Sequence, residues 1–319
     1  MARRKLILDL DTGIDDAMAI AYALGAPDVD LIGIIGSYGN VIVEEGGKNS
    51  LKILELLGAT DVPVYLGESH ASQTDHFDRL PVSANIHGEN GIGGVQLPEA
   101  KRPLETTSGV DFLIDAVNQY GKDLTLVPTG PLTNLAAAIK KDPDLPTKIG
   151  NVTIMGGALT VPGNVTPYAE ANIHQDAEAA NAVFTSPIRL TMVGLDVTLR
   201  NILTKKETQE WRNLKTKAGT DFADIVDYYI DAYADFDATL HGCVLHDPLA
   251  VGVALDPTLI TSFDLNMIVS TDKESYGRTI GDTTRINQPD ANITVGLTSD
   301  SKRYLETFMN YLTKLFKQN

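Results

Sequence analysis

The chain has 319 residues, of which 43% are hydrophobic, and this size and composition suit one large α/β domain with a sizeable core. A formal net charge of −16 argues against nucleic acid or an anionic membrane surface as a bulk partner. Cys243 is the only cysteine, which excludes an intrachain disulfide and a zinc site built from cysteines.

The N-terminal segment begins with the basic residues MARRK, but only three apolar residues follow, which is too short for the core of a signal peptide. Because no apolar run approaches the roughly 20 residues of a membrane span, we expect a soluble, cytoplasmic protein. The apolar residues 6–8 predict a buried strand that leads into four aspartates, Asp9, Asp11, Asp15 and Asp16. These carboxylates would repel one another unless a cation or the hydroxyls of a sugar shared the site.

Predicted strands and helices alternate along the rest of the chain. The further strands are predicted at residues 30–36, 63–66, 123–128, 151–155, 188–195, 264–270 and 292–298. The helices are predicted at residues 15–25, 43–57, 108–120, 132–141, 176–184, 205–240, 246–255 and about 300–316. A long glycine-rich loop is expected at 67–100, and a polar loop or hairpin from Tyr276 to Arg285. This alternation predicts a single domain, residues 1–319, with a mostly parallel β-sheet flanked by helices.

In open α/β sheets, ligands bind beyond the carboxyl ends of the strands. Besides the four aspartates, the residues at or after predicted strand ends include Asn40, Thr129, Met155, Asn164, Glu170, Asn172, His246 and Asp247. Most of them offer oxygen atoms and none is Lys or Arg, which favours a hard cation with a neutral polyol over a phosphate. We therefore expect Ca²⁺, with Mg²⁺ as the alternative, bound by Asp11, Asp16, Asp247 and a backbone carbonyl. Asp247 also suits a helix start before Pro248.

Two known types of acidic loop do not match the residue spacing of this segment. An EF-hand loop that began at Asp9 would need glycine at its sixth position, where Ile14 stands. A phosphatase of the haloacid-dehalogenase type has Thr or Val two residues beyond its second aspartate, where this chain has Gly13.

The segment LDLDTGIDDAMAI resembles the Asp-x-Asp-x-Gly-x-Asp-Asp signature of the inosine-uridine nucleoside hydrolases. Six further blocks resemble segments of that family in the same order: IIGSYGN, NIHGENGIGG, LVPTGPLTNLA, IMGGA, GNVTPYAEANIHQDAEAA and VLHDPLAV. The departures are small, since Thr12 and Ala177 stand where many members have proline and neither is a proposed ligand.

The resemblance implies a Rossmann-like nucleoside hydrolase fold that hydrolyses the N-glycosidic bond of ribonucleosides to ribose and free base. It implies a Ca²⁺ cofactor held by Asp11, Asp16, the carbonyl of Thr129 and Asp247, a role in nucleoside salvage, and a homodimer or homotetramer. The expected specificity is the broad inosine-uridine type, and a pyrimidine-preferring enzyme is the alternative. A phosphotransferase and a non-catalytic calcium- or ribose-binding protein are the rival classes.

The resemblance also implies roles for single residues. Asp11 would act as the general base on a water molecule. The ribose would be held by Asp15, Asp16, Met155, Asn164, Glu170 and Asn172, and Asn40 would contact the ribose or the attacking water. His246 is the leading candidate for the acid that protonates the leaving base, and His87, Tyr229 and Tyr233 are the other residues expected to contact the base. The i, i+4 spacing of the two tyrosines is also typical of core packing.

Overall fold

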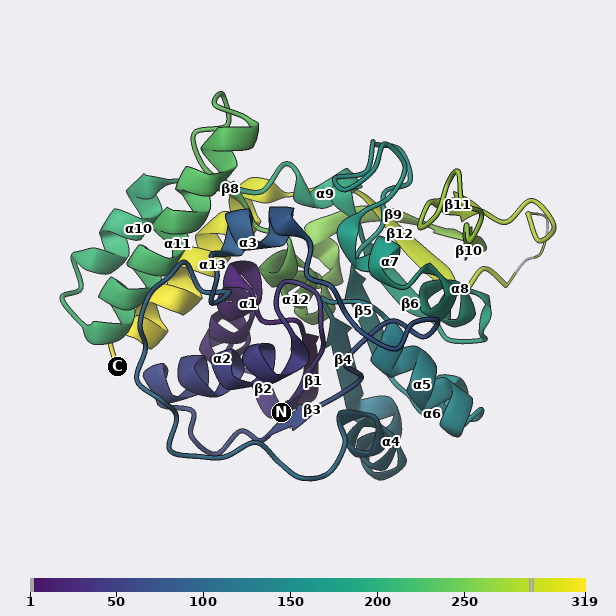
Figure 1. Cartoon of the computed structure of the whole chain (residues 1–319), viewed down its shortest axis with the longest axis horizontal. Helices are drawn as coiled ribbons and strands as arrows, with labels where there is room; N and C mark the ends of the chain where they lie inside the picture. Colours follow the sequence, from purple (N-terminus) through teal and green to yellow (C-terminus); the bar gives the residue numbers. More distant parts are fainter. Residues whose placement is uncertain (1–2, 287, 289) are drawn as a thin grey trace.

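The computed structural model describes residues 3–286, 288 and 290–319, and its centre is one eight-stranded sheet (Figure 1). The strand order is β3-β2-β1-β4-β5-β6-β12-β9. The bounds are β1 Arg4–Leu10, β2 Val29–Gly36, β3 Val64–Leu66, β4 Leu124–Pro128, β5 Asn151–Met155, β6 Leu190–Val193, β9 Ile260–Leu265 and β12 Ile293–Ser299. Only the pairing of β9 with β12 is antiparallel in this sheet, so the predicted mostly parallel α/β sheet is confirmed.

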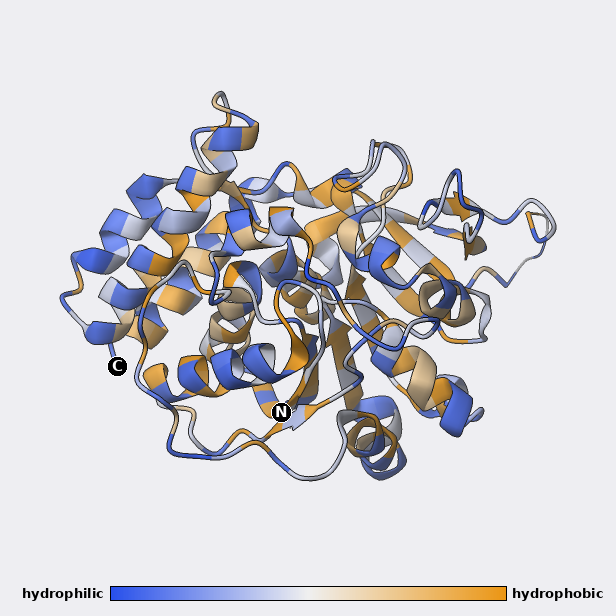
Figure 2. Ribbon diagram, viewed as in Figure 1, coloured by the Kyte–Doolittle hydropathy of each residue, from blue (hydrophilic) through white to orange (hydrophobic). Residues whose placement is uncertain are grey.

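Helices cover both faces of the sheet, and Figure 2 shows that their apolar sides turn inward. One face carries α1 Ile14–Gly25, α2 Val43–Leu56, α11 Lys217–Phe236, α12 Asp247–Leu255 and α13 Ser301–Phe316. The other carries α4 Gly109–Tyr120, α5 Thr133–Lys141 and α8 Ala177–Thr185. Strand β1 serves both cores, because Leu6 and Leu8 point to the first and Ile7 to the second, as the two-residue period of a strand requires.

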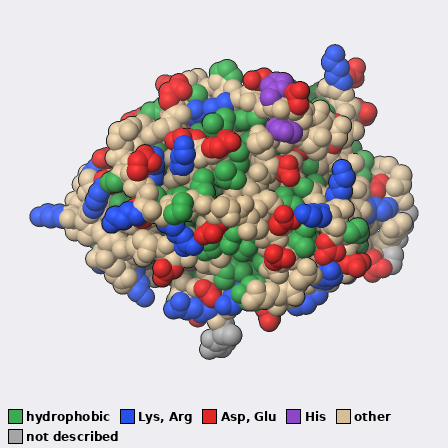
Figure 3. Space-filling view, turned by 60° about the horizontal axis from the view of Figure 1, so that its bottom comes forward, with side chains coloured by type: hydrophobic (Ala, Val, Ile, Leu, Met, Phe, Trp, Pro, Cys, Tyr) green, Lys and Arg blue, Asp and Glu red, His purple; other side chains and the backbone are tan. Residues whose placement is uncertain are grey.

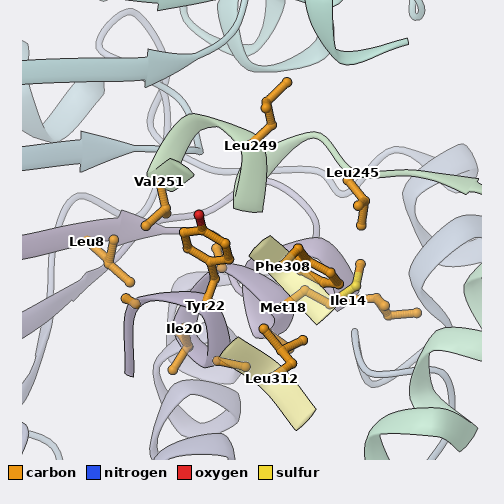
Figure 4. Packing of buried hydrophobic residues seen from close by; sticks show 14 of the residues in the cluster. Leu8, Ile14, Met18, Ile20, Tyr22, Leu245, Leu249, Val251, Phe308 and Leu312 are labelled. Atoms are coloured by element: carbon orange, nitrogen blue, oxygen red, sulfur yellow. The ribbon is translucent and has the colours of Figure 1, made fainter. Parts of the chain in front are cut away.

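The first core is built on α1, which is buried along almost its whole length. In Figure 4, Met18 and Tyr22 of this helix lie beside Phe308 and Leu312 of α13, and Leu249 and Val251 belong to α12. Tyr22 and Phe308 stack with their ring centroids 6.1 Å apart. This packing fixes the start of α1, where two of the four aspartates lie.

Three predicted segments differ from the structure. The helical region 205–240 is two helices, α10 Lys205–Arg212 and α11, because Lys215 has a φ of 61° and the Thr216 hydroxyl caps α11 by accepting from the Gly219 N–H. The segment 264–270 is divided between β9 and β10 Met267–Val269, which belong to different sheets. The long loop 67–100 contains a helix, α3 Pro81–His87.

The remaining elements are short. They are α6 Leu145–Lys148, α7 Ala171–Gln175, α9 Leu195–Thr198, β7 Ile202–Leu203, β8 Cys243–Val244, β11 Thr279–Gly281 and two 3₁₀ turns, Gly121–Asp123 and Pro257–Leu259. Strand β11 pairs with β10, so the segment between Tyr276 and Arg285 contributes to a hairpin, one of the two predicted options.

Strand β1 lies between β2 and β4, so the chain turns to opposite sides of β1 to form its two neighbours. The carboxyl ends of strands at such a switch point open a crevice in which ligands bind. Acidic and basic side chains are interspersed over the face shown in Figure 3, so no large field of one sign forms there. Within the described residues, no helix combines the length and apolar character needed to span a bilayer.

Candidate active site

The four aspartates lie at this switch point, between the end of β1 and the first turn of α1. Asp9 is level with Pro128 of β4, and the N–H of Thr129 donates to the Asp9 carbonyl over 2.8 Å. Asp15 and Asp16 lie in the first turn of α1, where the helix dipole favours negative charge, and Asp16 accepts from the N–H of Gly13 over 2.8 Å. All four side chains are buried.

Asp247 joins this cluster from the distant helix α12. Carboxylate oxygens of Asp15, Asp16 and Asp247 lie within 4.8 Å of one another. Asp247 also begins α12 with Pro248 behind it, so the helix start and the place in the cluster are compatible roles. The group contains Asp15, whereas the sequence-based ligand set contains Asp11 beside Asp16 and Asp247.

Burial and mutual repulsion disfavour the charged forms of these carboxyls. Desolvation, with the nearby Asp16, raises the pKa of Asp15 to about 7 and that of Asp11 well above its usual range. Within the described chain, Oδ1 of Asp11 and Oδ1 of Asp15 are buried without a hydrogen-bond partner. Buried, unpaired carboxylate oxygens that face one another are a suitable donor set for a hard cation.

Thr129 lies between the aspartates and the next part of the site. Its hydroxyl donates to Oδ1 of Asp16 over 2.8 Å, and its carbonyl accepts from Nδ2 of Asn172 over 2.7 Å. The same Asn172 amide lies 3.2 Å from the Met155 carbonyl. The predicted carbonyl ligand is therefore in direct contact with the group predicted to hold ribose.

Glu170 is held by backbone groups. It is the N-cap of α7 and accepts from the N–H groups of Asn172, Ile173 and Gly157 over 2.8 to 3.2 Å. Its burial raises the pKa to about 7. Asn164 is fixed differently, since its Oδ1 accepts from the Ala171 N–H over 2.9 Å.

Two hydrogen bonds connect Asn40 to the acidic cluster. Its backbone N–H donates to Oδ2 of Asp11 over 2.7 Å, and its side-chain amide lies 3.3 Å from Oδ2 of Asp16. Asn40 therefore orients one carboxylate through its backbone and contacts a second through its side chain.

The histidines and tyrosines form a second hydrogen-bonded group in the site. Nε2 of His246 lies 2.9 Å from the Tyr233 hydroxyl, and Nδ1 lies 2.9 Å from the Thr198 hydroxyl. Tyr229 donates to Asp15 over 3.2 Å and packs edge-on against Tyr233. His87 accepts the Ile14 N–H at Nδ1 over 3.1 Å, so its proton resides on Nε2. Burial lowers the pKa of His87 to about 3 and that of His246 to about 4, so both rings are neutral near pH 7.

These residues enclose a cavity of about 290 Å³, near the lower end of the usual size for small-molecule sites. Among the predicted residues, Asp9, Asp11 and Asp16 are not part of the cavity lining. The lining contains all the other predicted site residues: Asp15, Asn40, His87, Thr129, Met155, Asn164, Glu170, Asn172, Tyr229, Tyr233, His246 and Asp247.

Sequence reasoning missed the apolar part of the lining, which consists of Val82, Ile86, Val165, Leu199 and Phe236 together with Ser83 and Ala171. Helix α3 had a usable signal, because Pro81 stands at its first turn and Gly88, with a φ of 76°, ends it. Leu199 and Phe236 carry no comparable local signal.

Comparisons with known proteins identify the family of this chain. The family described as inosine-uridine preferring nucleoside hydrolase matches residues 6–306. A solved purine-preferring ribonucleoside hydrolase from Gardnerella vaginalis is 54% identical, with a TM-score of 0.98 over 99% of this chain and 100% of that chain. Uridine nucleosidase 1 of Arabidopsis thaliana is 38% identical over 81% of this chain and 75% of its own length. A pyrimidine-specific ribonucleoside hydrolase of Escherichia fergusonii is 36% identical over 91% of this chain and 93% of its own length. The chain therefore belongs to the inosine-uridine preferring nucleoside hydrolases, which are N-glycosyl hydrolases.

Proposed function

We propose that residues 1–319 form a single nucleoside hydrolase domain that cleaves ribonucleosides to ribose and free base with Ca²⁺ as cofactor. The observation that carries this proposal is the buried aspartate cluster, of which Asp15 and Asp247 line a cavity that also has amide, histidine and tyrosine side chains. By family membership we extend the proposal to nucleoside salvage in the cytoplasm and to a homodimer or homotetramer.

The cation would be held by Asp11, Asp16, Asp247 and the Thr129 carbonyl, with Asp15 close enough to take part. When bound, Ca²⁺ would act as a Lewis acid that lowers the pKa of water and neutralises the carboxylates. Asp11 suits the general base, because Asn40 fixes its Oδ2 while Oδ1 has no partner among the described residues and is free to take a proton.

The polar wall would position the ribose. Asn40, Met155, Asn164, Glu170, Asn172 and Asp15 line the cavity, and a carboxylate oxygen of Asp16 lies within 4.8 Å of one of Asp15. Hydrogen bonds from a sugar to such fixed groups hold the reacting carbon in place, and negative oxygens around it stabilise the positive charge that develops on the ribose.

The departing base needs a proton, and we propose that the imidazolium form of His246 supplies it through the Tyr233 hydroxyl, which lies 2.9 Å from Nε2. Nε2 would pass its proton to the hydroxyl as the hydroxyl passes its own to the base, which leaves His246 neutral and Tyr233 unchanged. His87 offers an N–H at Nε2 and would donate a hydrogen bond to the base. His87 would donate as a neutral ring, whereas His246, whose pKa burial lowers to about 4, would first have to take up a proton from solvent.

Broad acceptance of bases is the proposed specificity. The base-facing wall is largely apolar, with Val82, Ile86, Leu199 and Phe236 among its residues, and apolar contacts discriminate weakly between bases. Purine-preferring and pyrimidine-specific enzymes both stand among the similar proteins, which supports the inosine-uridine type. A pyrimidine-preferring enzyme is the alternative, favoured by the pyrimidine-specific relative.

The test is ribose release from inosine, adenosine, guanosine, uridine and cytidine, measured in parallel with Ca²⁺ and with a chelator. We expect release from both inosine and uridine, and loss of release after chelation. Asp11→Asn should slow turnover by about 10²–10⁴-fold, the usual contribution of a general base. The matched control is Asp115→Asn, on the exposed side of α4.

Three results would count against parts of the proposal. Full activity in Asp11→Asn would exclude Asp11 as the base, and an unchanged rate in chelator would exclude the metal. Release from uridine and cytidine alone would favour the pyrimidine-preferring alternative.

A further inference from the structure

We propose that Arg79 is a positioning residue that sets the base-facing wall of the cavity by holding helix α3 in place. The inference rests on the proposed function, because only a nucleoside substrate gives this wall a base to contact. Arg79 lies two residues before α3, outside the cavity lining, and its side chain is only 17% exposed.

The guanidinium of Arg79 donates to three backbone carbonyls of α3 and the turn that follows it. Nη2 lies 2.7 Å from the Gly88 carbonyl and 3.3 Å from the Ser83 carbonyl, and Nη1 lies 2.9 Å from the Glu89 carbonyl. Ser83 belongs to α3, whereas Gly88 and Glu89 follow its last residue, so one charged donor ties the helix to the turn behind it.

Helix α3 needs such support because its seven residues are too few for a stable isolated helix. Its other contacts are with α11, with the start of α1 and with the Gly93 N–H, which donates to the His87 carbonyl over 2.9 Å. The Tyr228 hydroxyl of α11 donates to the Asn85 carbonyl over 3.3 Å, and the Ile14 N–H donates to His87 over 3.1 Å. Arg79 is therefore the principal charged anchor of α3 among the described residues.

What α3 presents to the cavity is confined to one wall. Val82, Ser83, Ile86 and His87 line it on the side of α11, which carries the tyrosines and Phe236. The residues proposed to hold ribose come from other segments: Asn40, Met155, Asn164, Glu170 and Asn172. Of the α3 residues, His87 also lies 3.8 Å from Asp15, so displacement of α3 should weaken contacts to the base more than contacts to ribose.

Lysine cannot reproduce this arrangement in full. The planar guanidinium presents donors in a fixed fork that reaches several carbonyls at once, whereas an ammonium is a single point of charge. Arg79→Lys should therefore give an intermediate result, and Arg79→Met should lose the anchor while keeping most of the side-chain length.

Arg102 offers a matched control in the same long connection. Its guanidinium lies 3.2 Å from the Thr60 carbonyl and 2.7 Å from Glu105, at a place that is not part of the cavity lining. Arg102→Met removes a comparable arginine without touching α3.

The experiment measures KM and kcat for inosine and uridine, the inhibition constant of free ribose, and amide hydrogen exchange of residues 81–88. In Arg79→Met we expect KM to rise by about tenfold, the factor that one hydrogen bond to a charged group represents. Ribose inhibition should change less than nucleoside KM, because His87 alone among the α3 residues lies near a group proposed to hold ribose. Exchange at 81–88 should accelerate, Arg79→Lys should lie between, and Arg102→Met should match the wild type.

The outcomes separate this inference from the proposed function. Unchanged nucleoside constants in Arg79→Met, or ribose inhibition weakened as much as nucleoside binding, would overturn the role of Arg79. If the wild type releases no ribose from any nucleoside, the proposed function fails, while the exchange data still show whether Arg79 holds α3.

Discussion

Gly39 controls the position of Asp11 by its lack of a side chain. Its φ is 154°, and a Cβ added there would lie 2.0 Å from Oδ2 of Asp11, the oxygen that Asn40 fixes. Gly39→Ala should therefore push the carboxylate away and reduce ribose release by about 100-fold, the effect of moving a reacting group by about 1 Å.

Gly94→Ala is the control that distinguishes the contact with Asp11 from backbone strain. Gly94 also has a positive φ, 71°, but a Cβ there would meet nothing within 4 Å. It should cost about 1 kcal/mol of stability and leave kcat unchanged. Equal kcat values in the two variants, measured with thermal unfolding as the check on folding, would show that Gly39 does not position Asp11.

The hydroxyl of Tyr233 is the next point to test, because it is the proposed path for the proton from His246. Tyr233→Phe keeps the ring against Tyr229 and removes only that hydroxyl. Hydrolysis of inosine should slow by about 10²-fold or more, the usual contribution of general acid catalysis. A 4-nitrophenyl riboside, whose leaving group departs as a stable anion, should be cleaved at the wild-type rate. Equal slowing of both substrates would assign Tyr233 to binding instead.

The side chains proposed to carry the chemistry follow from local patterns in the sequence, and those that support them do not. Asp11, Glu170 and His246 stand at or near strand and helix ends in a pattern that local chemistry explains. Arg79 and Thr198 act on backbone carbonyls or on a histidine that lies far away in the sequence. Such partners depend on the packing of distant segments, so no spacing in the sequence reveals them.

At the scale of elements, the same contrast separates regular segments from connections. The strand at 151–155 was predicted to the residue, because a short apolar run between polar turns has one suitable structure. The division of 264–270 between two sheets was not predictable, because both halves have the composition of a strand and only their partners, β12 and β11, differ.

Asp176 connects the segment after β3 to α8 through hydrogen bonds, and we expect these bonds to be essential for stability. Asp176 is fully buried and accepts from the N–H and hydroxyl of Ser72, the hydroxyl of Thr133 and the N–H of Ala179. Asp176→Ala removes the N-cap of α8 and leaves buried donors unpaired, so we expect a loss of about 2–4 kcal/mol in the free energy of unfolding.

Ser72→Ala is the smaller change in the same group of hydrogen bonds. It removes one hydroxyl donor and keeps the backbone bond, so it should cost about 1 kcal/mol. Denaturant unfolding measures the loss of stability in both variants. If the two variants lost equal stability, the capping of α8 by Asp176 would contribute nothing beyond its bond to Ser72.

On the scale of the whole molecule, the strand order explains how residues far apart in sequence form one site. Strands β2 and β4 flank β1, so the turns after all three reach the same edge of the sheet. Helix α12 then packs on α1 and brings Asp247 to the same place. The fold therefore gathers carboxylates in its interior, and it does so at a cost in stability that depends on pH.

The pH dependence of stability should reveal this cost and its relief by calcium. Burial raises the pKa of Asp9, Asp15 and Glu170 to about 7 each, above the ordinary 3.8 for Asp and 4.5 for Glu. The folded chain thus binds more protons than the unfolded chain between those values, so this contribution to stability is present below about pH 4 and is lost as the pH rises through about 7. Calcium competes with protons for the aspartates, so the increase in Tm on adding Ca²⁺ should be larger at about pH 8 than at about pH 6. Scanning calorimetry in chelator and in Ca²⁺ measures both effects, and Asp15→Asn should reduce the difference between the two pH values. An increase in Tm that is the same at both pH values would mean that the cation does not bind at these carboxylates.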